Sequence, residues 1–190
     1  MIAASHSFAN NIIEGNLGSK IQGEVVLKFN YPWSMSFIDN DHLLVATKPG
    51  KLWLVDSFGS KTEVKNIMKV QYGGQGGMGD VVPHPNYKKN KYIYLSYITS
   101  DDGGKTRYAV VDRAKLSDLN SPKLENRQRI WEQFPAVKGK GHFSHRIVFG
   151  PEGSAHENKI FITSGDRQMQ HPAQMWETNF GKIIRLNDDG

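Results

Sequence analysis

The chain has 190 residues, of which 38% are hydrophobic and 23% are charged, a composition that fits a folded globular protein and excludes a disordered chain. Its longest apolar run is only a few residues, far below the roughly 20 that span a bilayer, so we expect no transmembrane segment. Cysteine is absent, which excludes disulfides and thiolate metal sites. The formal net charge is +5, and the basic residues are dispersed along the chain.

Residues 1 to about 20 are polar and aperiodic, and we interpret 1–20 as an N-terminal arm that precedes a domain at 21–190. No basic segment followed by a long apolar stretch opens the chain, so no signal peptide is visible. The densest basic cluster is Lys88, Lys89 and Lys91. We interpret it as a solvated turn between strands, so nucleic acid is not an expected partner.

The rest of the chain shows short apolar runs that are separated by Gly, Pro, Asn and Asp, which accept the dihedral angles of hairpin turns. A first strand is predicted at 24–29. Three sets of three strands then follow, with roughly 50 to 70 residues between sets. The sets are 33–38, 43–47 and 52–56; 80–83, 92–97 and 108–112; and 146–149, 159–163 and 182–187.

No stretch keeps a helical period, so the sequence predicts an all-β chain. The repeat favours about three blades of a β-propeller, although a single β-sandwich would produce a similar pattern. Propellers close with four to eight blades, and three blades alone would leave an unpaired edge. We therefore expect the chain to be truncated at its C-terminus.

Three segments could carry chemistry. In the first, Gly73–Asp80, glycines allow close approach of a flat ligand and Gln75 offers it an amide, although a plain structural loop remains an alternative. In the second, His142 lies in a glycine-flanked loop before a strand, and histidine is the residue type that most often serves as a general base. A merely solvated histidine is the alternative. His145 follows, but a third metal ligand is missing at any clear spacing.

The third segment ends a predicted strand with Asp166, which could orient a nearby imidazole or could simply cap backbone amides. In their order and spacing, these segments resemble the glucose/sorbosone dehydrogenase family, and within it the soluble PQQ-dependent aldose sugar dehydrogenases. The motifs that carry the resemblance are Gly-Gln-Gly-Gly-Met-Gly-Asp at 74–80, Gly-His-Phe-Ser-His-Arg at 141–146, Ser-Gly-Asp-Arg at 164–167, and Gly-Lys-Ile-Ile-Arg-Leu-Asn at 181–187. It runs from about Tyr31 to Gly190.

The resemblance implies a six-bladed propeller with pyrroloquinoline quinone (PQQ) over its central channel. It implies that His142 is the base that removes the proton of the sugar's anomeric hydroxyl while hydride passes to the quinone. Gln75 and His142 would contact the quinone, and Asp166 would support His142. The product would be the lactone, and an external acceptor would take the electrons. The resemblance also implies a periplasmic or secreted protein.

This sequence departs from the family at two positions. Gly141 stands where glucose-specific members carry an acid, which favours the broader aldose branch, and His145 stands where a small residue is usual. The family's basic quinone ligands and its calcium site come from later blades, so the calcium ligands are expected outside this chain. The chain contains no expected metal ligands, and we expect it to be inactive alone.

A non-catalytic propeller that binds a protein or a glycan is the alternative function, since the same architecture hosts many activities. The joint presence of Gln75, His142 and Asp166 favours the enzyme. A propeller hydrolase would need a caged metal, for which the sequence shows no cluster. The sugar, the natural acceptor and the oligomeric state are not predicted.

Overall fold

The structure is a computed structural model that describes residues 11–190. It divides into two units, residues 1–30 and residues 31–190, which are described separately. In the first unit, β1 (Asn11–Glu14) pairs antiparallel with β2 (Lys20–Gly23). The remainder of the predicted arm, residues 1–10, lies outside the described residues, and the boundary predicted at residue 20 stays a prediction.

The strand that we predicted at 24–29 is wrong, because these residues form no strand in the structure. Their exposure alternates as in a strand. A β-strand, however, needs a neighbour that supplies backbone partners, and no ladder includes 24–29 in the part of the chain that the structure describes. Local β-propensity was therefore insufficient here.

The second unit consists of three antiparallel sheets in which the strand order follows the chain. The first sheet contains β3 (Pro32–Phe37), β4 (His42–Thr47), β5 (Lys51–Asp56) and β6 (Lys61–Glu63). The second contains β7 (Met78–Pro83), β8 (Tyr92–Thr99), β9 (Tyr108–Leu116) and β10 (Leu124–Glu132). The third contains β11 (Ser144–Phe149), β12 (Lys159–Ser164) and β13 (Lys182–Asn187).

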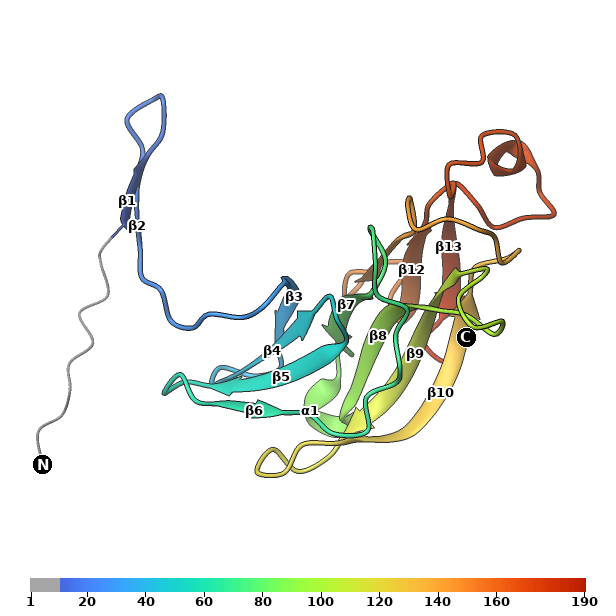
Figure 1. The fold of residues 1–190 in the computed structure, drawn as a ribbon. Coiled ribbons are helices and arrows are strands. Elements are labelled where there is room, and N and C mark those ends of the chain that lie inside the picture. Colours follow the sequence, from blue (N-terminus) through green and yellow to red (C-terminus); the bar gives the residue numbers. More distant parts are fainter. Residues whose placement is uncertain (1–10) are drawn as a thin grey trace, which may run out of the picture. The chain divides into compact units, whose positions relative to one another are not determined.

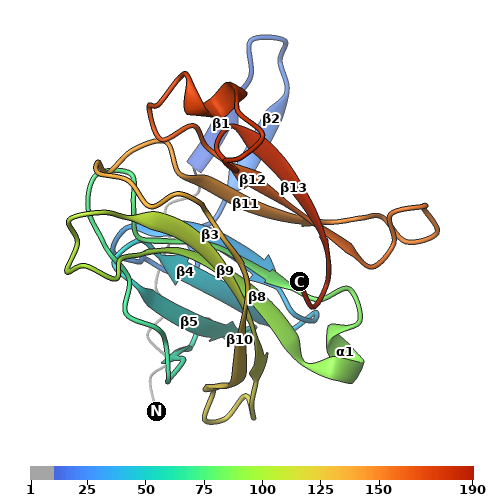
Figure 2. The ribbon, with the colours of Figure 1, turned by 90° about the vertical axis from the view of Figure 1, so that its right-hand side faces the viewer.

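The three sheets lie side by side, with the first strand of each nearest to its neighbours: β3 contacts β7, and β7 contacts β11 (Figures 1 and 2). This is the arrangement of consecutive blades in a β-propeller. All nine strands of the three predicted sets are present, which confirms the all-β fold and the count of about three blades. The helical segments described in residues 11–190, α1 (Tyr87–Asn90) and η1 (Pro172–Gln174), are too short to cross a membrane.

Hydrophobic side chains fill the two spaces between the sheets. β8 shows why: Leu95 and Tyr97 belong to the core against the first sheet, whereas Tyr94 and Ile98 belong to the core against the third. Because successive side chains of a strand point to opposite faces, the apolar run of β8 is buried on both sides. The middle blade thus holds the other two in place.

Candidate active site

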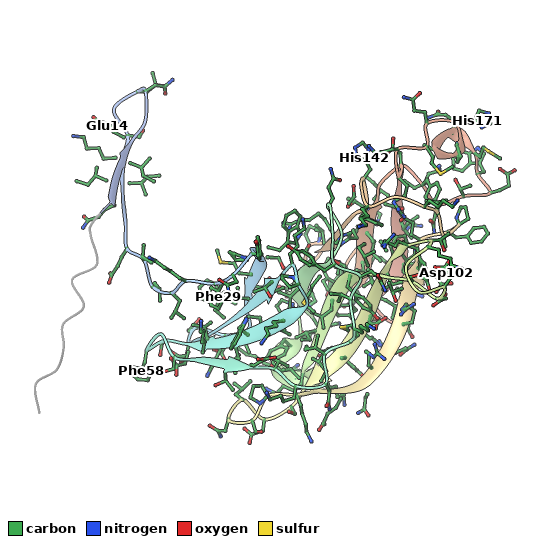
Figure 3. The ribbon with its side chains drawn as sticks, in the orientation of Figure 1. Glu14, Phe29, Phe58, Asp102, His142 and His171 are labelled. Atoms are coloured by element: carbon green, nitrogen blue, oxygen red, sulfur yellow. The ribbon has the colours of Figure 1, made fainter. Side chains whose placement is uncertain are left out.

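Gln75, His142 and Asp166 all lie in loops at one end of the three sheets, the end where β7 and β11 begin and β12 ends. Figure 3 shows His142 at this end of the third sheet. The structure therefore brings together the three site residues that the sequence predicted. Although they are far apart in the sequence, hydrogen bonds connect His142 directly to each of the other two.

The His142 ring contacts the Asp166 carboxylate, with 2.8 Å between Nδ1 and Oδ1. A carboxylate accepts hydrogen bonds but does not donate them, so in the neutral ring Nδ1 carries the proton and Nε2 keeps a lone pair. The side chain of His142 is 48% exposed, which leaves the ring open to a ligand. The imidazole is thus held in the tautomer that a general base at Nε2 requires.

Asp166 has a second partner. Its Oδ1 also accepts a hydrogen bond from the backbone N–H of Gln168, at 2.9 Å. This backbone bond, followed by the bond from His142, lowers the pKa of Asp166 from its ordinary value. The sequence left open whether Asp166 caps backbone amides or contacts an imidazole. In the structure it does both.

Gln75 is fixed to the same loop as the imidazole. Its side-chain Oε1 accepts from the backbone N–H of His142 at 2.7 Å, and its own backbone N–H donates to the carbonyl of Lys140 at 2.8 Å. Gln75 is an exposed residue, and its amide nitrogen donates no hydrogen bond within the described residues. It can donate to a ligand that lies against the exposed face of His142.

The glycines around Gln75 serve contacts between chain segments. A Cβ at Gly74 would lie 2.7 Å from the carbonyl oxygen of Lys140, and one at Gly77 would collide with the carbonyl of Lys48. Lys48 also donates from Nζ to the carbonyl of Gly74 at 2.6 Å. We predicted that these glycines allow a ligand to approach closely; the structure shows that they allow the His142 loop and the β4–β5 turn to do so.

His145 lies apart from this site, although it follows His142 by three residues. It is 4% exposed, and its Nδ1 lies 2.8 Å from Oγ of Ser96 on β8. A Cβ at Gly79 would collide with its ring, so the glycine makes room for it. Burial lowers the pKa of His145 to about 4, so the buried ring is neutral at pH 7.

In the described residues, no group of three or more His, Asp or Glu side chains could hold a metal ion. Nε2 of the half-exposed His142 side chain and the NH₂ group of Gln75 fit one edge of a flat, polar ligand. They supply one acceptor and two donor hydrogens in neighbouring loops. The quinone contact that the resemblance implies for these residues stays a prediction.

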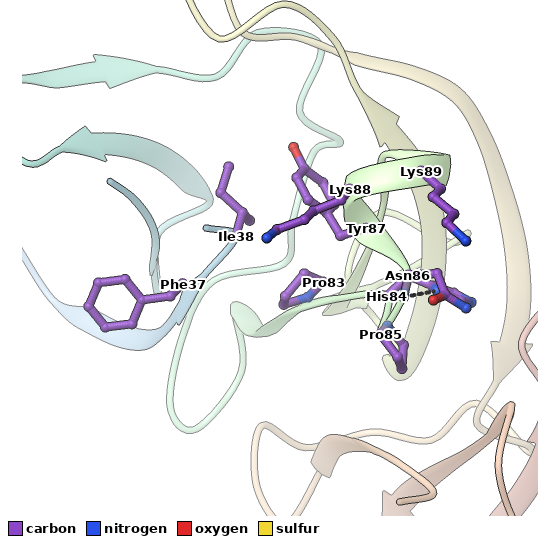
Figure 4. A pocket seen from close by; sticks show the side chains of 9 residues that line it. All are labelled: Phe37, Ile38, Pro83, His84, Pro85, Asn86, Tyr87, Lys88 and Lys89. Carbon is purple, nitrogen blue, oxygen red and sulfur yellow. Dashed lines mark hydrogen bonds between the residues drawn. The ribbon is translucent and has the colours of Figure 1, made fainter. Parts of the chain in front are cut away.

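Two features were not predicted from the sequence. Arg167, directly after Asp166, is buried at 3% exposure and donates to several backbone carbonyls of the site loops. The second is a cavity of about 400 Å³ at the other end of β7, among Phe37, Ile38, Tyr87 and Lys88 (Figure 4). It lies across the length of the strands from His142 and is not part of this site.

Comparison with known proteins finds similarity to sugar dehydrogenases. The aldose sugar dehydrogenase YliI of Escherichia coli is 31% identical over 166 residues, which cover 86% of this chain and 43% of that protein. The quinoprotein glucose dehydrogenase B of Acinetobacter calcoaceticus is 27% identical over 192 residues, covering 82% of this chain and 38% of its own length. The chain thus spans less than half the length of these relatives.

A crystal structure of a glucose dehydrogenase superimposes with a TM-score of 0.77 at 29% identity, covering 84% of this chain and 45% of that one. It supports the assignment of the three sheets as propeller blades. The family model described as Glucose / Sorbosone dehydrogenase matches residues 29–190, which include the whole of the second unit. The chain belongs to the glucose/sorbosone dehydrogenase family.

Proposed function

We propose that the protein oxidises the anomeric hydroxyl of aldose sugars to the lactone, with PQQ as the bound acceptor. The observation that carries the proposal is the exposed His142 ring, hydrogen-bonded through Nδ1 to Asp166 at 2.8 Å and through its backbone to Gln75 at 2.7 Å. The quinoprotein among its relatives and its family membership support the choice of cofactor.

In this proposal, Nε2 of His142 accepts the proton of the sugar hydroxyl. The resulting imidazolium carries its positive charge next to Asp166, whose carboxylate stabilises it. When bound, PQQ supplies the acceptor for the hydride that leaves the same sugar carbon. Gln75 holds the loop of the imidazole, because its Oε1 accepts from the backbone N–H of His142.

The proposal concerns the whole protein. The resemblance assigns the basic ligands of the quinone and the calcium ion to residues outside this chain, so we infer little or no turnover by the 190 residues alone. We also infer that an external acceptor reoxidises the quinone and that the whole protein is periplasmic or secreted. Gly141, in place of an acid, favours a broad range of aldoses.

The test is to express the complete protein, reconstitute it with PQQ and calcium, and assay aldoses with an artificial acceptor dye. We expect sugar-dependent dye reduction and formation of the lactone. His142→Ala should lower kcat by about 10²- to 10⁴-fold, the usual contribution of a positioned base. His156→Ala is the matched control, since His156 lies in the exposed β11–β12 connection and should keep full activity.

Two outcomes would contradict the proposal. Unchanged turnover in His142→Ala would remove this residue from the mechanism. A complete, correctly folded protein that binds sugars but never reduces the dye, with or without PQQ, would favour the non-catalytic binding propeller instead.

A further inference from the structure

Arg167 is a cation buried between the second and third sheets. It is 3% exposed, and its guanidinium lies over the ring of Phe143, 3.8 Å from the centroid. A buried charge is costly unless hydrogen bonds replace its lost hydration. The position of Arg167 therefore depends on what it contacts.

Its partners in the described part of the chain are oxygen atoms of carbonyls and of one amide. Nε donates to the carbonyl of Gly141 at 3.0 Å, and Nη2 donates to the carbonyl of Gly139 at 3.1 Å. Nη1 donates to the carbonyl of Arg107 at 2.6 Å, with Oε1 of Gln133 at 3.5 Å. The planar guanidinium thus binds two carbonyls, those of Gly139 and Gly141, in the loop that precedes His142.

The backbone of Arg167 adds a third connection to this loop, because its N–H donates to the carbonyl of His142 at 3.2 Å. Asp166, its neighbour, binds the ring of the same histidine. The dipeptide Asp166-Arg167 therefore fixes His142 from two sides, the ring through the acid and the backbone through the arginine. His142 itself has φ 50°, an uncommon angle for a non-glycine residue, so its conformation needs support from its surroundings.

We propose that Arg167 is a positioning residue for His142: its buried guanidinium clamps the carbonyls of Gly139 and Gly141 and thereby holds the imidazole against Asp166. The inference rests on the proposed function only for its effect on turnover. Lysine cannot replace arginine here, because a single ammonium lacks the planar fork that reaches the separate carbonyls and stacks on Phe143.

The decisive experiment compares Arg167→Lys with the native chain by ¹⁵N NMR of the His142 imidazole, without quinone, at a pH where the ring is neutral. We expect a single tautomer, protonated at Nδ1, in the native chain and a mixture of tautomers in Arg167→Lys. Arg129→Lys is the matched control, because Arg129 also binds and stacks within the second sheet, on Asp112 and Tyr97. It should leave the His142 signals unchanged.

In the complete enzyme, Arg167→Lys should lower kcat by about 10- to 100-fold with little change in KM, the expected cost of a displaced catalytic group. The two proposals separate cleanly. A changed tautomer in a protein without dehydrogenase activity would refute the proposed function and support the clamp. A single Nδ1–H tautomer in Arg167→Lys would refute the clamp, whatever the turnover.

If Arg167→Lys does not fold, hydrogen exchange in the native chain still decides. The Nε–H of Arg167 should exchange much more slowly than that of Arg127, whose side chain is 47% exposed. Equal exchange rates at the two arginines would show that no lasting bond to Gly141 exists, and the inference would be overturned.

Discussion

Asp166 accepts two hydrogen bonds at one oxygen, from the ring of His142 and from the backbone of Gln168. The first bond orients a side chain, and the second fixes the carboxylate itself. At the scale of single residues, each functional side chain of the site is thus held by a hydrogen bond to a partner that is itself fixed. The same holds for the amide of Gln75 and the backbone of His142.

Asp166→Asn tests how much the negative charge of Asp166 contributes to turnover. The amide keeps the size of the side chain but loses the negative charge that stabilises an imidazolium, and it can present NH₂ to the ring and select the wrong tautomer. We expect kcat of the complete enzyme to fall by at least about 100-fold while the Tm stays within a few degrees. Steady-state kinetics and calorimetry measure both; an unchanged kcat would contradict the role of Asp166.

His145 should make the fold sensitive to acid. Its folded pKa of about 4 lies below the ordinary 6.5, so the unfolded chain binds more protons between these values. Its contribution to stability is complete above about pH 6.5 and is lost progressively as the pH falls to about 4. A shift of this size corresponds to about 3 kcal/mol.

Urea unfolding at pH 7 and at pH 4.5 measures this effect. His145→Asn keeps a polar atom near Ser96 but cannot be protonated, so its free energy of unfolding should change less between the two pH values than that of the native chain. If both proteins lose the same stability, charging of His145 is not the cause.

The candidate residues could be predicted, but their supports could not. A histidine, an amide and an acid in strand-flanking loops are visible as residue types with suitable chemistry. Arg167 is adjacent to Asp166 in the sequence, yet a basic residue after a strand usually faces solvent. Its burial depends on Gly139 and Gly141, which approach only when the loop folds back, and no local pattern encodes that distance.

At the scale of elements, Asp80 on β7 connects two sheets. Its carboxylate accepts from the backbone N–H of Ile147 on β11 at 3.0 Å and from the guanidinium of Arg146 at 3.0 Å. Its backbone N–H donates to Oγ of Ser96 at 2.7 Å. Burial raises the pKa of Asp80, and the bonds to Ile147 and Arg146 act in the opposite direction.

Asp80→Asn should weaken this connection. The amide can accept at only one of its two heavy atoms, so either Ile147 N–H or Arg146 loses its partner, and a buried unpaired group costs about 1–3 kcal/mol. We expect the free energy of unfolding at pH 7 to fall by about that amount. Asp118→Asn, in the exposed β9–β10 turn, is the control and should have little effect. Equal effects of the two substitutions would contradict the role of Asp80.

The sequence missed the hairpin of β1 and β2 in the first unit and, in the second unit, the outermost strands of two sheets. β6 has three residues, two of them exposed, and the middle of β10 exposes Asn126, Arg127, Gln128 and Arg129. Such strands bury few apolar side chains, so they lack the alternation by which a strand is recognised. The inner strands were predicted correctly because they bury apolar side chains, on both faces in β8 and at alternate positions in β12.

At the scale of the whole molecule, the second unit carries exposed apolar side chains on strands of its first and third sheets. Met35 and Phe37 of β3 are 68% and 67% exposed, and Ile183 of β13 is 72% exposed. Apolar groups gathered on one sheet face and edge promote association. We therefore expect the 190-residue chain to self-associate at high concentration.

Replacing Met35 and Phe37 together by serine should reduce this association, which analytical ultracentrifugation over a range of concentrations measures. Phe58→Ser is the control, since Phe58 is 92% exposed but lies alone in the β5–β6 turn. Association that is the same in all three proteins would show that the β3 surface is not responsible.

The packing of His145 against Gly79 has a consequence for how such a protein can change over time. A methyl group at Gly79 would collide with the imidazole and would also lie 2.7 Å from Oγ of Ser96. A larger residue at position 79 would therefore require smaller side chains at both 145 and 96. The three positions limit one another, because a change at the glycine alone gives a protein that cannot pack.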